Sequence, residues 1–423
     1  MRPFRTAEII AVGSELLTPF RADTNSLVLT TRLNDLGVAV SGKAIVGDDV
    51  EMLAALVRLA LARVDLVVTT GGLGPTEDDV TRDAVARALA LSMSEDPALV
   101  GAIEARFARR GVVMPAINRR QAMVPQGAVV LVNPAGSAPG LWIETGDKAV
   151  VLLPGPPREM LAILDGDLGP RLSARSGVHR VERRVILMTG RPESAVDEVI
   201  APIYGPWRTA PVPIETTILA GGGQIEVHLS ATSDGSDAAG KRLDAAVGTL
   251  ADALGEIVFS VDGRPLEAVV GSALRARGLR IAAAESCTGG GLLSRLTDIP
   301  GSSAYVIGGV VAYDNAVKVA DLGVPAEMLA SYGAVSEPVA RAMAEGVRER
   351  LSADVGVAVT GIAGPDGGSV EKPVGTVVIA IAVTGRASAV RTSLFFGDRA
   401  MIRTQSVVAA LDMVRRALLT LSP

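Results

Sequence analysis

Residues 279–290 read LRIAAAESCTGG. The apolar start of this stretch is typical of a buried strand, and the residues from Gly289 onward begin the apolar pattern of a helix. Such a turn between strand and helix gathers backbone N–H groups around Ser286, where they could hold an anion or a developing oxyanion. A serine before a helix is also a common N-cap, so this stretch alone is compatible with a structural or a catalytic serine.

Two further polar segments follow predicted strands. Residues 313–318 (YDNAVK) come after the apolar run 306–311, and residues 360–368 (TGIAGPDGG) come after the apolar run 355–359. In an open α/β sheet, the loops beyond the carboxyl ends of the strands form the ligand crevice. We therefore expect a serine, a tyrosine, a lysine and a glycine cradle to meet in one pocket.

The composition predicts a large α/β protein. The chain has 423 residues, of which 48% are hydrophobic, 21% charged and 3% aromatic, with 46 glycines. This length predicts two or three domains. Few aromatic side chains leave little surface for stacking bases, and a net charge of −5 gives no overall attraction to nucleic acid. We expect no direct nucleic-acid binding.

Cysteine and histidine are rare in this chain. Cys287 is the only cysteine, and no run resembles a signal peptide or a membrane span, so we expect a cytoplasmic protein without membrane association. The two histidines, His179 and His228, lie outside the three segments above. The C-terminal part therefore cannot form a Ser-His-Asp triad or a zinc site of cysteine and histidine ligands, and any metal would need oxygen ligands.

The order of predicted elements divides the chain into three parts. Strands and helices alternate in the first part, at residues 7–12, 25–36, 38–46, 50–62, 65–70 and 80–89. Residues 165–176 are rich in Gly, Asp, Pro and Ser and indicate a linker. We predict an α/β fold: three-layer domains with parallel or mixed sheets at residues 1–168 and 263–423, and a small α+β domain at residues 175–260.

A glycine-rich loop follows the strand predicted at residues 65–70. Gly71, Gly72 and Gly74 would let backbone amides approach a phosphate closely. Asp78 and Asp79 come at the start of the next helix, where they could hold a divalent cation that bridges to the phosphate. Acidic residues in that position also complement the helix dipole, and the sequence leaves both roles open.

Several stretches of the C-terminal part carry a family resemblance: ESCTGG (285–290), YDNAVK (313–318), TGIAGP (360–365), KPVGT (372–376), FGDR (396–399) and Arg403. From Pro265 to the end, the chain resembles the nicotinamide-nucleotide amidase domain of the CinA (competence/damage-inducible protein A) family. The resemblance implies hydrolysis of the carboxamide of nicotinamide mononucleotide to nicotinic acid mononucleotide and ammonia, without a cofactor.

With no histidine available, we expect a Ser-Lys amidase in which Ser286 attacks the carboxamide, Lys318 accepts its proton and Tyr313 relays or orients that proton. Enclosure in the site would lower the basicity of the lysine enough for this role. Backbone N–H groups would form the oxyanion hole, a glycine cradle would hold ribose or phosphate, and two arginines would bind the phosphate or a neighbouring subunit. The substrate-binding residues expected are Glu285, Cys287, Thr288, Gly289, Gly290, Thr360, Gly361, Gly364, Arg399 and Arg403.

Three of these roles have alternatives at this point. Cys287 could be the nucleophile, because a helix N-terminus lowers the pKa of a thiol. Glu285 could orient Lys318 or form an internal salt bridge. Tyr313 could be a packed aromatic at a strand end.

The glycine loop at residues 69–74 (TTGGLG), with DVT (79–81), belongs to a second set of family-like stretches: GSELL (13–17), DTN (23–25), VGDD (46–49), NPAG (133–136) and LPGPP (153–157). These resemble the molybdopterin-binding fold and, more closely, the N-terminal domain of CinA, whereas TPFRA (18–22) departs from that pattern. The resemblance implies phosphate binding by Gly71, Gly72, Gly74, Asp48 and Thr81, a divalent metal at Asp78 and Asp79, and metal-dependent cleavage of ADP-ribose.

Two other classes of function are compatible with these patterns. One is a competence or recombination adaptor that acts through protein partners, and the other is a molybdopterin-binding protein without amidase activity. The family resemblance also suggests a homodimer, with the helix expected at residues 399–419 as its interface.

Overall fold

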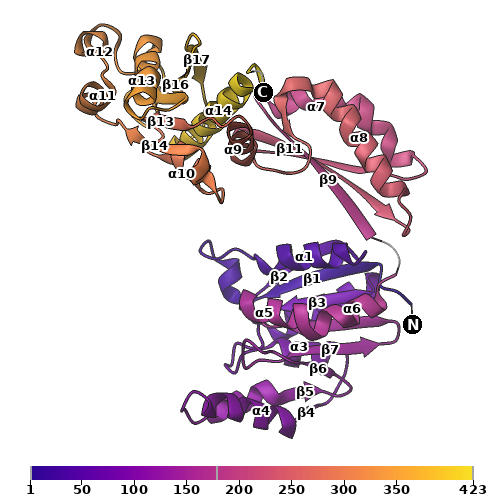
Figure 1. The fold of residues 1–423 in the computed structure, drawn as a ribbon. Coiled ribbons are helices and arrows are strands. Elements are labelled where there is room, and N and C mark those ends of the chain that lie inside the picture. Colours follow the sequence, from indigo (N-terminus) through magenta and orange to yellow (C-terminus); the bar gives the residue numbers. More distant parts are fainter. Residues whose placement is uncertain (1, 178–179, 422–423) are drawn as a thin grey trace. The chain divides into compact units, whose positions relative to one another are not determined.

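The computed structural model describes residues 2–177 and 180–421, so His179 lies outside the described residues. The chain forms two compact units (Figure 1). One unit comprises Met1–Glu182 and Ala231–Gly240, and the other comprises Arg183–Ser230 and Lys241–Pro423. In the part of the chain that is described, no helix is long and apolar enough to cross a membrane.

A six-stranded mixed sheet forms the centre of the N-terminal unit, in the order β2-β1-β3-β8-β7-β6. Strands β1 (Thr6–Val12), β2 (Ala39–Val46), β3 (Leu66–Thr70) and β8 (Lys148–Leu153) pair in parallel. Strand β7 (Gly140–Thr145) pairs antiparallel with β8, and β6 (Val129–Leu131) pairs antiparallel with β7. The central strands are almost continuously apolar because helices cover both faces of the sheet.

Helices form the two outer layers of this domain (Figure 1). Ile9 and Ile10 on β1 belong to separate apolar cores because successive side chains on a strand point to opposite faces. One core receives α1 (Asn25–Asp35), α5 (Pro157–Ile163) and α6 (Gly169–Arg175), and the other receives α2 (Val50–Arg63) and α3 (Thr81–Ala88). A small lobe adds β4 (Met93–Glu95), α4 (Pro97–Ala108) and β5 (Met123–Pro125).

The linker expected at residues 165–176 is wrong, because this segment is helical and packs against the core. A π-helical turn, Leu164–Leu168, leads directly into α6. Leu164, Leu168 and Leu172 recur every four residues and are all buried in the domain core. The glycine and proline that suggested a linker occupy the first turn of α6, where proline is well tolerated.

The middle part of the chain has its own four-stranded sheet, in the order β10-β11-β9-β12. Its elements are β9 (Arg180–Thr189), α7 (Glu193–Tyr204), β10 (Glu215–Gly221), β11 (Gln224–Ser233), α8 (Ala238–Leu254) and β12 (Val258–Ser260). This β-α-β-β-α-β order is a common α+β arrangement. Leu187 and Phe259 pack into the same apolar core as the C-terminal domain, which is consistent with their membership of one compact unit.

The C-terminal domain is a second three-layer domain with a mixed sheet, in the order β14-β13-β15-β16-β17. Strands β13 (Ile281–Glu285), β14 (Val306–Val311) and β15 (Val355–Gly361) pair in parallel. Strand β16 (Thr376–Val383) pairs antiparallel with β15, and β17 (Ala389–Leu394) pairs antiparallel with β16. One face is covered by α9 (Leu266–Ala276), α10 (Gly291–Thr297) and α14 (Arg399–Leu419), and the other by α11 (Asn315–Leu322), α12 (Ala326–Tyr332) and α13 (Glu337–Arg350).

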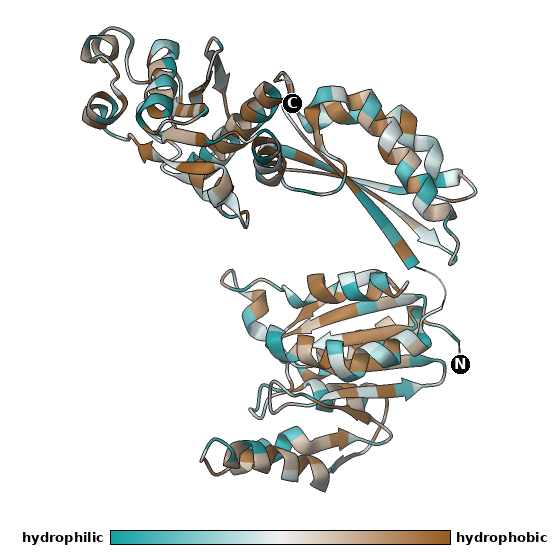
Figure 2. Cartoon of the chain, viewed as in Figure 1, coloured by the Kyte–Doolittle hydropathy of each residue, from teal (hydrophilic) through white to brown (hydrophobic). Residues whose placement is uncertain are grey.

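Hydropathy follows these layers. The central strands of both end domains are mostly apolar, while the helices alternate apolar and polar residues (Figure 2). The predicted fold class, with three-layer α/β domains at both ends and an α+β part between them, is confirmed. In the C-terminal domain, the loops after β13, β14 and β15 leave the sheet at one edge, because these strands are parallel.

Candidate functional site

The loops after β13, β14 and β15 enclose a pocket of about 260 Å³ in the C-terminal domain. The residues that line it are Ser286, Cys287, Tyr313, Asn315, Lys318, Ala334, Val335, Thr360, Gly361, Ile362, Ala363, Gly364, Asp366, Gly367 and Arg399. The structure thus brings together the predicted serine, lysine and tyrosine with the glycine cradle.

Ser286 begins a tight turn at the end of β13. Its N–H donates to the carbonyl of Val359 on β15 (2.9 Å), and its carbonyl accepts from the N–H of Gly289 (3.2 Å). Among residues 2–177 and 180–421, the N–H of Thr288 has no acceptor, and the N–H of Cys287 faces only its own thiol. Of these two residues only Cys287 lines the pocket beside Ser286, so its N–H is the one that could serve as an oxyanion donor.

Lys318 lies on α11 and reaches into the pocket with a side chain that is only 1% exposed. Its Nζ donates to the carbonyls of Ala312 (2.8 Å) and Tyr313 (3.2 Å). Burial holds the pKa of Lys318 below its usual 10.5, and the nearby Asp314 opposes this shift. A neutral amine has two N–H groups and one lone pair, so these carbonyls can satisfy both donors and leave the lone pair for a proton from the pocket.

The tyrosine side chain contacts an arginine. Tyr313 is 62% exposed, so the alternative of a packed aromatic is wrong. Its hydroxyl accepts from Arg399 (3.0 Å), and Arg399 also donates to the carbonyl of Gly364 (2.7 Å). The side chain of Tyr313 therefore orients Arg399, and its backbone carbonyl holds Lys318; this arrangement differs from the expected proton relay.

Glu285 has a structural position that neither of its proposed roles anticipated. Its fully buried carboxylate accepts from the N–H groups of Leu292 (3.0 Å) and Leu293 (2.9 Å), in the first turn of α10. It neither bonds Lys318 nor lines the pocket. The expectation of a substrate contact is wrong for this residue, because both carboxylate oxygens are committed to the helix.

The thiol of Cys287 is poorly suited to act as the nucleophile. The side chain is only 5% exposed, and burial raises its pKa to about 11. Very little thiolate would form near neutral pH, and the thiolate is the reactive form. Ser286 remains the nucleophile that the geometry favours.

Four more residues predicted to bind substrate do not line the pocket: Thr288, Gly289, Gly290 and Arg403. Arg403, on α14, donates to the carbonyl of Thr288 (2.8 Å). By contrast, Thr360, Gly361 and Gly364 do line the pocket.

Sequence reasoning missed two polar residues of this pocket. Asn315 is the first residue of α11 and lies three positions before Lys318, a spacing that places both on one helix face. Asp366 follows the glycine cradle in the loop after β15. Asn315 belongs to the segment 313–318 and Asp366 to the segment 360–368, both described from the sequence. Their short distance along the chain from Lys318 and Gly364 was the signal that could have identified them.

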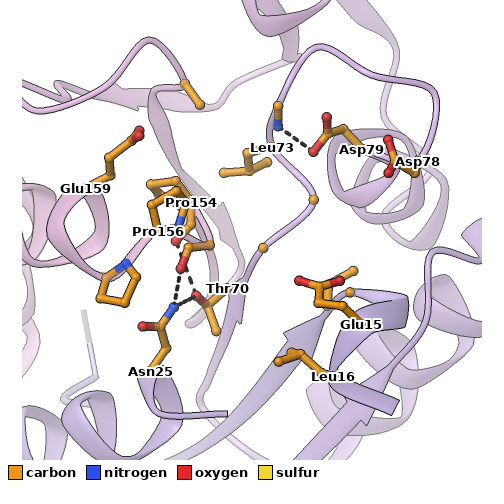
Figure 3. A pocket seen from close by; sticks show the side chains of 18 of the residues that line it. Glu15, Leu16, Asn25, Thr70, Leu73, Asp78, Asp79, Pro154, Pro156 and Glu159 are labelled. Carbon is orange, nitrogen blue, oxygen red and sulfur yellow. Dashed lines mark hydrogen bonds between the residues drawn. The ribbon is translucent and has the colours of Figure 1, made fainter. Parts of the chain in front are cut away.

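A larger pocket, about 790 Å³ in volume, lies beside the glycine loop of the N-terminal domain (Figure 3). Gly71, Gly72, Gly74 and Asp48 line it, as predicted. A Cβ on Gly71 would lie 2.0 Å from the carbonyl oxygen of Val12, and its φ of +107° also excludes other residues. Glycine is therefore required at this position for the loop to pack against the end of β1.

Two residues predicted to bind ligand instead hold the glycine loop together. The carboxylate of Asp79 accepts from the N–H of Gly74 (2.6 Å), the N–H of Thr76 (2.8 Å) and the hydroxyl of Thr76 (2.6 Å), and Figure 3 shows it turned toward the loop. Thr81 is fully buried and donates its hydroxyl to the carbonyl of Gly71 (2.8 Å). The expected phosphate contact of Thr81 is wrong, because this side chain does not line the pocket.

The predicted metal site at Asp78 and Asp79 does not fit the geometry. Asp79 accepts three hydrogen bonds from the loop, and together with Asp78 it supplies only two carboxylates. Across the described ranges, no three His, Cys, Asp or Glu side chains are grouped as a metal site requires. The residues present do not form a cation site of their own.

Comparisons with known proteins cover both domains. The family model of the CinA C-terminal domain matches residues 263–418, and a model described as "Probable molybdopterin binding domain" matches residues 8–174. The chain thus joins a molybdopterin-binding-like domain to a CinA C-terminal domain.

The full-length relatives agree with this division. A CinA-like protein of Acidobacterium capsulatum is 47% identical over 417 residues, which cover 98% of this chain and 100% of the relative. A CinA-like protein of Koribacter versatilis is 46% identical over 98% of this chain and 100% of its own length. The chain belongs to the CinA family. A crystal structure of the competence/damage inducible protein CihA from Agrobacterium tumefaciens matches 37% of this chain and 94% of that one, with 42% identity and a TM-score of 0.36.

Proposed function

We propose that the C-terminal domain hydrolyses the carboxamide of nicotinamide mononucleotide to nicotinic acid mononucleotide and ammonia. The observation that carries this proposal is that Lys318, buried and hydrogen-bonded to two backbone carbonyls, lines the same pocket as Ser286. A hydroxyl nucleophile needs such a base when no histidine is at hand.

The reaction follows from these groups. Ser286 Oγ forms a bond to the carboxamide carbon, and its proton passes to Lys318 Nζ. The N–H of Cys287, which lines the pocket next to Ser286, stabilises the oxyanion that develops. Lys318 then returns the proton to the departing nitrogen, and ammonia leaves an ester on Ser286. Water, deprotonated by Lys318, hydrolyses this ester and releases the carboxylic acid.

The rim of the pocket suits the rest of the nucleotide. Arg399 is exposed and uses one N–H toward Tyr313 and one toward Gly364. A guanidinium has five N–H donors, so three remain for a phosphate. Gly361 lines the pocket and would contact the ribose, whereas Thr360 is fully buried and donates its hydroxyl to the carbonyl of Ala334 (2.9 Å).

The test is ammonia release from nicotinamide mononucleotide by wild type, Ser286→Ala and Lys318→Ala. Lys372→Ala is the matched control, because Lys372 also donates to a backbone carbonyl, that of Tyr332 (3.0 Å), but does not line the pocket. We expect turnover in wild type and the control and its loss in the other two. Wild-type protein that is folded but releases no ammonia would contradict the proposal.

A second activity, metal-dependent cleavage of ADP-ribose, is proposed only as far as the N-terminal pocket supports it. Its volume of about 790 Å³ is adequate for a dinucleotide-like ligand, and the glycine loop lines one side. Since the carboxylates do not form a cation site of their own, any cation would have to arrive with the diphosphate. Release of AMP from ADP-ribose with and without Mg²⁺ measures this activity. A tightly bound pterin would instead favour a molybdopterin-binding protein. A protein partner, found without turnover of either substrate, would favour the competence or recombination adaptor.

A further inference from the structure

We propose that Arg403 is a positioning residue that holds the Ser286 turn in its reactive shape, while Arg399 is the arginine that recognises the phosphate. The inference rests on the proposed amidase function. It separates two residues that sequence spacing alone places in one role, because positions four apart lie on the same face of a helix.

The two arginines of α14 contact different segments: Arg399 bonds Tyr313 and Gly364, and Arg403 bonds the turn at Thr288. Arg399 lines the pocket and is exposed, whereas Arg403 is half-buried and lies outside the lining. Arg403 Nη2 donates to the carbonyl of Thr288 (2.8 Å), and Thr288 itself is only 1% exposed. A Cβ on Gly289 would lie 3.3 Å from the same Nη2, so the guanidinium packs directly against the turn backbone.

Arg403 has a particular place among the contacts of this turn. Within the described residues, it is the one side chain that hydrogen-bonds the backbone of residues 286–290. Gly289 and Gly290 have φ values of +58° and +92°, a left-handed conformation that suits glycine and leaves this backbone easily moved. Small displacements of a catalytic group cost about 100-fold in rate, so a clamp behind the turn affects the chemistry without touching substrate.

The charge of Arg403 also acts at the turn. Burial dominates the pKa of the Cys287 thiol and raises it, but the positive charges of Arg403 and Arg399 oppose this rise. A charge that favours an anion at Cys287 also favours the oxyanion that forms beside the N–H of Cys287. Arg403 therefore supports both the geometry and the electrostatics of the acylation step.

The test compares Arg403→Met, Arg403→Lys and Arg399→Met, with nicotinamide mononucleotide and with nicotinamide riboside, which lacks the phosphate. For Arg403→Met we expect kcat to fall roughly 10- to 100-fold with both substrates, with KM changed less than about twofold. Arg403→Lys keeps the positive charge and an N–H donor for the carbonyl of Thr288, and it should recover most of the kcat. Arg399→Met should raise KM for the mononucleotide, with a much smaller effect on the riboside.

Thermal unfolding of each variant identifies any loss of fold; if Arg403→Met does not fold, Arg403→Gln replaces it, with the same fall in kcat and the same nearly unchanged KM expected. A rise in KM confined to the mononucleotide in Arg403→Met would show that Arg403 binds phosphate, and unchanged kinetics would show that it does nothing for the turn. Either result overturns the inference while wild-type turnover keeps the proposed function. A silent wild type overturns both.

Discussion

Replacing Glu285 by alanine should lower the stability of the C-terminal domain by about 3–5 kcal/mol. The carboxylate is fully buried and accepts two backbone hydrogen bonds, from Leu292 and Leu293, at 3.0 and 2.9 Å. Hydrogen bonds to a charged group contribute about 1.5–3 kcal/mol each, so two give about 3–6 kcal/mol, and relief of the buried charge subtracts a part of this. Glu285→Gln retains one acceptor and should cost about 2 kcal/mol, since its NH₂ group would face the second N–H.

Thermal unfolding and steady-state kinetics measure this prediction together. For a domain of this size, each kcal/mol shifts the midpoint by about 2–4 °C, so Glu285→Ala should unfold roughly 10 °C below wild type and Glu285→Gln about 5 °C below it. At a temperature where all three proteins are folded, KM should stay close to that of wild type. Glu267→Ala is the control for the KM measurement, because Glu267 is another acidic residue of this domain but is paired with Arg295 away from the pocket. An unchanged midpoint with a raised KM would refute the capping argument and restore Glu285 as a substrate contact.

Three further outcomes are expected. Because burial holds the pKa of Lys318 below 10.5, kcat/KM should rise with pH as this group loses its proton; the unfolding free energy should also rise with pH between the lowered pKa and 10.5, since the unfolded chain binds the proton more tightly. Lys318→Arg, which stays protonated, should lose roughly 100- to 10,000-fold in kcat, and a pH profile shared by both proteins would exclude Lys318 as the base. Cys287→Ala should keep turnover within about tenfold, because a thiol with a pKa of about 11 is not the nucleophile; complete loss of ammonia release in a folded variant would reverse that assignment. Asp79→Ala should destabilise the N-terminal domain by about 2 kcal/mol without any added metal, and destabilisation seen only in the presence of Mg²⁺ would indicate a metal ligand instead.

The fold could be predicted where periodicity was strong. The apolar runs 306–311 and 355–359 became β14 and most of β15, and the helix expected at residues 50–62 became α2. The prediction failed at residues 165–176, where composition was given more weight than the four-residue spacing of the leucines. Glycine and proline indicate a turn only when no apolar face is present to bury.

The candidate site could be predicted as a set of segments but less well as a set of roles. The choice of Ser286 and Lys318 as nucleophile and base rested on the strand-end motifs and the family resemblance, together with the lack of a nearby histidine, and it stays a prediction. The same reasoning placed Glu285 and Asp79 at ligands, since a carboxylate in a polar turn has the same sequence signature whether it binds a ligand or a backbone N–H. The structure shows which atoms each oxygen contacts.

The sequence by itself determined the elements, their order and the polar residues at the strand ends, since these depend on local periodicity and on the connection of parallel strands. Only the tertiary structure decided which side of each turn faces the pocket. Arg399 and Arg403 lie one helical turn apart with the same side-chain chemistry, yet one lines the pocket and the other bonds the backbone behind it. The physical reason is that a side chain's role depends on burial and on the nearest donor or acceptor, and both are set by segments distant in the chain.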